Sequence, residues 1–218
     1  VLHAVAHAIF KSGLFMGAGA IVSQLHTRDL ERMGGLAKRM PKFSGAMLVL
    51  ARGAAALPPF AAFMSEWMFL QGLLGSVLLA PPAVQGVLIL ILSGIAFVGG
   101  LAVFAMVKMF GIAFLAKPRG DHAAHAQEPP FALAGPVFLM AALTLAVGLA
   151  APIMLETIGF TSLTDGARLV SGGGALSPFA LAALFAAVVA AVVLARRTFS
   201  DVKAERPYHA WDCGQPIT

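Results

Sequence analysis

Charged residues and cysteines are both scarce in this chain of 218 residues. Asp, Glu, Lys and Arg make up 11% of it, whereas soluble domains carry about a quarter. A soluble globular domain is excluded, because it would have to bury several near-continuous apolar stretches of about 20 residues. Cys213 is the single cysteine, which excludes an intrachain disulfide and a four-cysteine iron–sulfur or zinc site.

Apolar stretches of membrane-spanning length recur along the chain, and 59% of its residues are hydrophobic. We expect an all-α, polytopic membrane bundle of about five helices, over residues 1–24, 43–74, 84–115, 131–155 and 178–195. Pro58 and Pro59 interrupt the second stretch. Proline removes a backbone donor and clashes with the preceding turn, so this helix should be broken into two half-helices.

The bundle should occupy residues 1–199 and a polar cytoplasmic tail residues 200–218. Because the sequence begins at Val1 inside an apolar stretch, without an initiator Met or a signal peptide, we expect a preceding part to be missing.

Lysine and arginine are distributed unequally between the two sides of this bundle. The loops on one side carry eleven of these residues, whereas the loops on the other side carry only Arg168. Because positive charge marks cytoplasmic loops, the basic side is predicted to face the cytoplasm. The net charge of +5 comes from these loops, so we expect no nucleic-acid partner. The basic side carries Arg28, Arg32, Lys38, Arg39, Lys42, Lys117, Arg119, Arg196, Arg197, Lys203 and Arg206.

Ionisable side chains also lie inside the apolar stretches, at His3, His7, Lys11 and Glu66. Residues four apart on an α-helix lie nearly above one another, so His3, His7 and Lys11 should form one polar stripe about 12 Å long. An uncompensated charge in hydrocarbon costs several kcal/mol, so such groups normally face a protein interior or a water-filled path. We therefore predict an ion or proton pathway through these residues.

Each residue of this pathway also has a structural interpretation. His3 and His7 could bind a metal, but HAVAH lacks the Glu of HExxH and no third ligand is evident, so we expect no metal. Lys11 could form an ion pair, although a buried lysine readily exchanges its proton. Glu66 could cap or pack the half-helix after the prolines, or exchange protons with water that enters at the break.

Two further cations lie within the apolar stretches. Lys108 comes late in the third stretch, and it either belongs to the proton pathway or reaches the headgroups. Arg52 precedes the proline break and cannot readily lose its proton, so we expect a counter-charge, with Glu66 as candidate partner, rather than a proton carrier.

Four segments within about residues 1–119 resemble the antiporter-like, proton-conducting subunits shared by respiratory complex I, Mrp antiporters and membrane-bound hydrogenases. They read HAIFKSGLFMGAGAI, HTRDLERMGGLAKRMP, LPPFAAFMSEW and VKMFGIAFLAKPR. The VKMFGIAF segment and the terminal WDCG are most similar to the hydrogenase-4 component B and formate hydrogenlyase subunit 3 branch. The family's conserved His and Lys fall on His7 and Lys11, with His3 a further histidine, and the charged residue of its broken helix falls on Glu66.

The resemblance implies a proton-translocating subunit of a redox-driven complex, of the group 4 hydrogenase or formate hydrogenlyase type, in a bacterial or archaeal cytoplasmic membrane. The chain itself would hold no cofactor, and its partners would be other membrane subunits and a peripheral hydrogenase or dehydrogenase arm. A complex I-type subunit and an Mrp-type sodium/proton antiporter subunit remain open as alternatives. An alternative of another class is a membrane anchor that conducts nothing.

Overall fold

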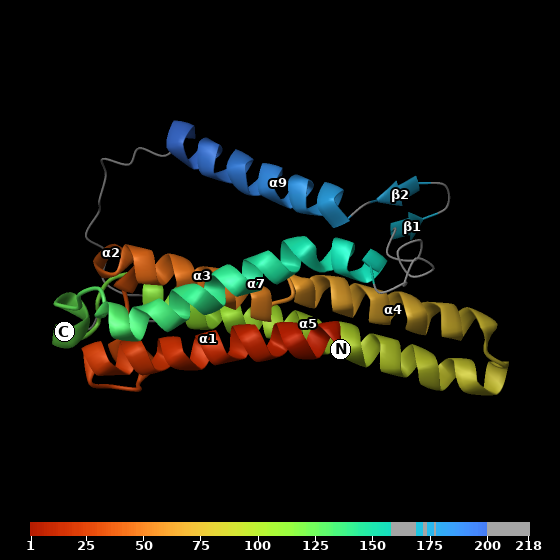
Figure 1. Ribbon diagram of the computed structural model, residues 1–218, viewed down its shortest axis with the longest axis horizontal. Helices are drawn as coiled ribbons and strands as arrows, with labels where there is room; N and C mark the ends of the chain where they lie inside the picture. The colour runs from red at the N-terminus through yellow and green to blue at the C-terminus, as the bar shows by residue number, and fades with distance from the viewer. Residues whose placement is uncertain (158–168, 172–173, 177, 200–218) are drawn as a thin grey trace, which may run out of the picture. The chain divides into compact units, whose positions relative to one another are not determined.

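A computed structural model describes residues 1–157, 169–171, 174–176 and 178–199, and this part is almost entirely α-helical (Figure 1). A short antiparallel hairpin of β1 (Leu169–Ser171) and β2 (Gly174–Leu176) is the exception and was not expected. The helices are α1 (Leu2–Leu25), the 3-10 turn η1 (Leu30–Arg32), α2 (Leu36–Arg39), α3 (Pro41–Ala54), α4 (Ala61–Leu79), α5 (Pro82–Phe114), α6 (Asp121–Ala124), α7 (Phe131–Thr157) and α9 (Pro178–Phe199).

The chain divides into two units, residues 1–181 and 182–218. Residues 182–199, within α9, are the described part of the second unit. The predicted tail 200–218 lies outside the described residues, and so do the WDCG segment with Cys213 and the outer arginine Arg168.

Four helices in the described part are long and apolar enough to cross a membrane. They are Leu2–Leu25, Ala61–Leu79, Pro82–Phe114 and Phe131–Ala151, and α9 adds a shorter apolar segment, Ala183–Ala195. The protein is therefore a multi-pass membrane helix bundle, which confirms the predicted fold class. With 33 residues, α5 is about 50 Å long and exceeds the hydrocarbon core of about 30 Å.

The predicted break in the second apolar stretch is confirmed. Helix α3 ends at Ala54 and α4 begins at Ala61, with a cis peptide bond between Pro58 and Pro59 in the connection. The expectation of two halves of one crossing needs correction, because α4 with its 19 residues is long enough to cross alone. The apolar sequence runs on past residue 74 to Leu79, so nothing ends the helix until the next proline pair at 81–82.

The backbone of the connection between α3 and α4 packs directly against the backbone of α7. A Cβ at Gly148 would lie 2.7 Å from the carbonyl oxygen of Pro59 and 2.8 Å from the Cα of Phe60. Ala61 and Ala62, the first residues of α4, are buried. Small residues on both sides therefore let α7 approach the connection closely.

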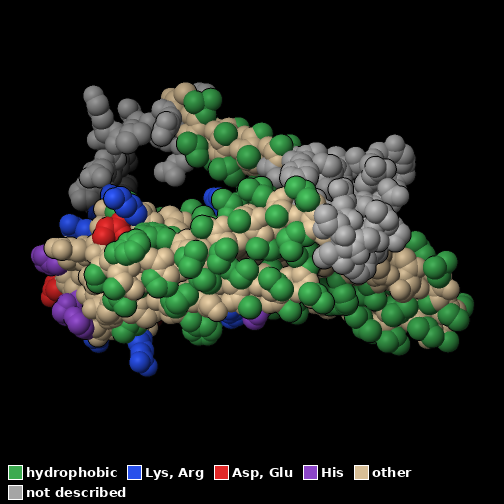
Figure 2. Space-filling model, in the orientation of Figure 1, with side chains coloured by type: hydrophobic (Ala, Val, Ile, Leu, Met, Phe, Trp, Pro, Cys, Tyr) green, Lys and Arg blue, Asp and Glu red, His purple; other side chains and the backbone are tan. Residues whose placement is uncertain are grey.

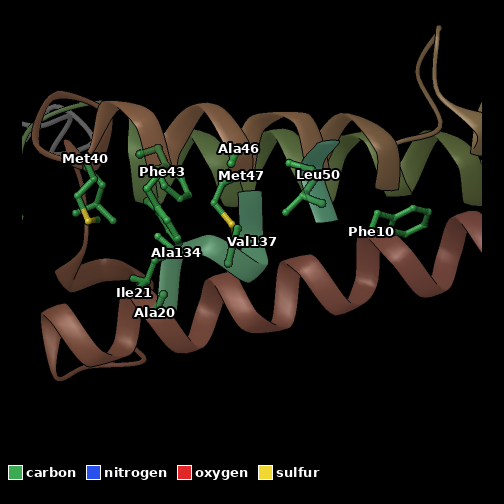
Figure 3. Packing of buried hydrophobic residues seen from close by; sticks show 14 of the residues in the cluster. Phe10, Ala20, Ile21, Met40, Phe43, Ala46, Met47, Leu50, Ala134 and Val137 are labelled. Carbon is green, nitrogen blue, oxygen red and sulfur yellow. The ribbon is translucent and has the colours of Figure 1, made fainter. Parts of the chain in front are cut away.

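The core of the first unit lies between α1, α3 and α7, where large side chains of α3 meet small residues of the other two helices (Figure 3). Phe43, Met47 and Leu50 recur every three or four residues and so share one face of α3. A Cβ at Gly13 would meet Leu50, and one at Gly17 would meet Met47, so these glycines make room for the α3 side chains.

Charged side chains gather at the end of the first unit where the loops after α1 and α5 lie (Figure 2). The Arg119 guanidinium donates hydrogen bonds to the carbonyl oxygens of Glu31, Leu30 and Ile112, at 2.9, 3.1 and 2.7 Å. The Glu128 carboxylate accepts hydrogen bonds from the first N–H groups of α3, those of Lys42 and Phe43. These contacts tie the basic loops together and satisfy backbone groups that helix ends leave open.

Candidate functional site

The start of α1 contacts the start of α4, directly after the proline break (Figure 1). His3 and Ser65 are 62 positions apart in sequence, yet the Nδ1 atom of His3 lies 2.9 Å from the Ser65 hydroxyl oxygen. Ser65 in turn donates a hydrogen bond of 2.8 Å to the carbonyl oxygen of Ala62. The break thus allows α4 to begin where Ser65, in its second turn, meets His3 of α1.

A cavity of about 690 Å³ opens at this junction. Its polar lining consists of His3, Ser65 and Glu66, and the remaining wall is made of apolar side chains from α1, α4 and α7, among them Val147. Glu66 is partly buried. The structure therefore brings His3 and Glu66, both predicted from sequence, to one cavity.

His7 continues this polar group along α1. The His3 and His7 rings are stacked, with centroids 6.2 Å apart and planes inclined by 22°. On its other side, His7 meets the ring of Phe10 edge to face at 5.2 Å. The two histidines are thus neighbours on one helix face, as their spacing predicted.

Lys11 lies one turn beyond His7 but does not line the cavity of Glu66. It is exposed in the described part of the chain and lines a second cavity of about 690 Å³, whose other cation is Arg28. Its ammonium nitrogen is 5.6 Å from the centroid of the Phe15 ring, within the range of a cation–π contact. The structure therefore separates Lys11 and Glu66, which the sequence placed on one pathway.

The two remaining predicted cations are not brought to this site. Lys108 is exposed on α5 and lines neither cavity. Arg52 lies half-buried in the last turn of α3, and no ion pair joins it to Glu66 in the described part of the chain. The role of Arg52 as a counter-charge stays a prediction that this geometry does not favour.

The composition of the site bears on metal binding. Within the described ranges, no three His, Cys, Asp or Glu side chains gather as a metal-binding group would require. The hydroxyl, imidazole and carboxyl that line the cavity, and the second imidazole stacked on the first, are instead groups that exchange protons with water and with one another. The arrangement is suited to proton transfer.

Sequence reasoning missed Ser65 and Gly148. Ser65 directly precedes an intramembrane carboxylate, and this position was a signal that could have been used. Gly148 carried no such signal, because it is one of 23 glycines in the chain. Its close approach to Phe60 depends on how α7 packs against the break.

Comparisons with known proteins show which family this chain resembles. Residues 1–96 match the family model described as NADH:quinone oxidoreductase/Mrp antiporter, TM. Hydrogenase-4 component B of Escherichia coli is 43% identical over 151 residues, which cover 69% of this chain and 22% of that protein. Formate hydrogenlyase subunit 3 of the same organism is 37% identical over 164 residues, covering 72% of this chain and 26% of that protein.

A solved structure shares the fold. It is that of the membrane-bound sulfane sulfur reductase, an archaeal respiratory membrane complex, and a chain in it matches with a TM-score of 0.65 and 22% identity. The match covers 100% of this chain and 35% of the other. The chain thus spans about a quarter to a third of the length of these relatives. The resemblance carried by the four sequence motifs is confirmed.

Proposed function

We propose that this chain, whose residues 1–96 match the family model described as NADH:quinone oxidoreductase/Mrp antiporter, TM, is an antiporter-like membrane subunit that moves protons across the bilayer. The complex that it serves is redox-driven and of the hydrogenase-4 or formate hydrogenlyase type, in view of the similarity to subunits of those names. In this proposal the redox centres lie in partner subunits of a peripheral arm rather than in this chain.

The observation that carries the proposal is the polar contact between two apolar helices at the cavity of Glu66. His3 and Ser65 form a hydrogen bond across α1 and α4, and the Glu66 carboxyl lines the same cavity. Ionisable groups are expensive inside a membrane and persist where they serve ion or proton movement. The loops at the charged end are cytoplasmic in this proposal, by the excess of lysine and arginine.

In the proposed pathway, Glu66 exchanges protons with water in its cavity, and the stacked rings of His3 and His7 carry them along α1. Lys11 stores a proton at the far end of the stripe. Across about 12 Å in a medium with an effective dielectric constant of about 20, two unit charges interact by about 1.4 kcal/mol. Protonation at one end of the stripe thus changes the protonation equilibrium at the other about tenfold.

Proton pumping in inverted membrane vesicles tests the proposal. The native complex is compared with Glu66→Gln and Lys11→Ala variants, and proton uptake is normalised to the rate of electron transfer. Because a positioned acid or base accelerates proton transfer by about 10²–10⁴-fold, each variant should pump at least about tenfold less per electron. Glu31→Gln and Lys42→Ala are matched controls, since both side chains are exposed at the charged end.

Wild-type pumping by both pathway variants would refute the proposal. A parallel loss of assembly and electron transfer, with the coupling ratio unchanged, would indicate a membrane anchor. The family description includes Mrp antiporters, so uptake is also measured with and without sodium. A strict sodium requirement would favour sodium/proton exchange.

A further inference from the structure

We propose that Ser65 is a positioning residue that holds His3 in the tautomer with its proton on Nδ1, so that Nε2 is the atom that takes up and releases the translocated proton. The assignment of the tautomer follows from local geometry alone. The role of Nε2 rests on the proton-moving function proposed above.

The number of hydrogen bonds that the Ser65 hydroxyl can donate and accept leads to this assignment. A hydroxyl has one hydrogen to donate and two lone pairs to accept with. Ser65 donates its hydrogen to the carbonyl oxygen of Ala62, at 2.8 Å. At its 2.9 Å contact with His3, it is therefore the acceptor, and the Nδ1 atom of His3 is the donor.

A neutral imidazole carries one proton, so a proton on Nδ1 leaves Nε2 with a free lone pair. His3 lines the same cavity as Glu66, which is the acid on the α4 side, while His7 is the titratable neighbour on α1. The α7 side chains that line the cavity, Val147 and Met154, are apolar. Nε2 is thus the nitrogen of His3 left available for a proton that arrives from Glu66 or from water.

A rotation of the Ser65 hydroxyl would reverse the arrangement. The hydroxyl would then donate to Nδ1, and the His3 proton would have to reside on Nε2. The carbonyl oxygen of Ala62 would lose its hydrogen bond from the Ser65 hydroxyl. It would keep the bond that an α-helix provides from the backbone N–H four residues later. Ser65 therefore sets which nitrogen of His3 is basic, because the Nδ1–H form keeps both hydrogen bonds of the Ser65 hydroxyl, whereas the reverse form keeps only the one to His3.

Helix α4 supplies a matched control. Ser76 makes the same kind of bond as Ser65, from its hydroxyl to the carbonyl oxygen of Gly72 at 2.9 Å, but it is exposed and lines neither cavity. A Ser76→Ala variant removes an equivalent intrahelical bond and leaves His3 untouched. Ser65→Thr keeps a hydroxyl at the site and serves as the rescue variant.

Nitrogen-15 NMR of the histidine-labelled native complex tests the proposal, with a His3→Gln sample to identify the His3 signals. We expect the Nδ1–H tautomer to predominate in the wild type. The ratio of Nδ1–H to Nε2–H should fall at least about fivefold in Ser65→Ala, which corresponds to the loss of one net hydrogen bond. It should stay at the wild-type value in Ser76→Ala and recover in Ser65→Thr.

A wild-type complex with mainly Nε2–H, or a ratio unchanged by Ser65→Ala, would overturn the tautomer assignment. Proton pumping per electron is then measured on the same variants, and it should fall in Ser65→Ala and recover in Ser65→Thr. A shifted tautomer with unchanged pumping would overturn the role of Nε2. Failure of the proposed function itself is recognised separately, from wild-type pumping in both Glu66→Gln and Lys11→Ala.

Discussion

Replacing Gly148 with alanine should destabilise the protein at the helix break. The new Cβ would lie 2.7 Å from the carbonyl oxygen of Pro59, 2.8 Å from the Cα of Phe60 and 3.1 Å from the backbone nitrogen of Ala61. All three atoms belong to the backbone, so no side-chain rotation relieves the contact. Overpacking of this kind costs about 1–3 kcal/mol.

Gly94→Ala is the matched control. Gly94 is also a helical glycine, on α5, and its Cβ would meet no heavy atom within 4 Å. Both substitutions gain the same backbone benefit, about 0.5–1 kcal/mol for Gly→Ala inside a helix. The difference between the two variants therefore isolates the steric cost at the break.

The assay is thermal unfolding of the two variant complexes, purified in the same detergent. At about 2–4 °C for each kcal/mol in a chain of this size, Gly148→Ala should melt about 2–12 °C below Gly94→Ala. The Gly148→Ala complex should also pump fewer protons per electron. The new methyl group would displace Phe60 and Ala61, and this would move Ser65 relative to His3. Equal melting temperatures, within about 1 °C, would refute the close packing of α7 on the break.

Two further predictions concern the charged end of the bundle. Glu128→Ala should lower the free energy of unfolding by about 1–2 kcal/mol, since its carboxylate accepts the N–H groups of Lys42 and Phe43 at 2.7 and 3.2 Å at the start of α3. Thermal unfolding beside the exposed Glu31→Ala checks it, and equal stability would disprove the cap. Gly34→Ala should cost about 1–3 kcal/mol, because Gly34 has φ of 138° and its Cβ would collide with the carbonyl oxygen of Lys117. Gly45→Ala, whose Cβ meets open space, is the control for the same melting experiment, and a Gly34 variant as stable as this control would contradict the strain.

The helices and the break could be predicted because their causes are local. An apolar stretch of about 20 residues satisfies its backbone hydrogen bonds within itself, and a proline interrupts that ladder wherever it occurs. The extent of α4 was predicted less well. The break was taken as the middle of one crossing, whereas the apolar sequence carries α4 on to Leu79.

The candidate site was predictable only in part. The spacing of His3 and His7 places them on one face of α1, and their rings do stack. The same spacing placed Lys11 on this stripe, and its position inside an apolar stretch assigned it to one pathway with Glu66, but Lys11 and Glu66 line different cavities. Position along one helix does not specify which neighbouring helix a side chain meets.

The sequence alone predicts the membrane-spanning helices, the break before α4, the charged end and the group of embedded ionisable residues, since each depends on composition or spacing within one segment. The contacts of Ser65 with His3, of Gly148 with Phe60 and of Glu128 with the start of α3 became known from the packed structure. These contacts join residues far apart in the chain, and the packing of α1, α3, α4 and α7 selects them. Local sequence patterns carry no information on that choice, because it is made by the shapes of whole helix faces.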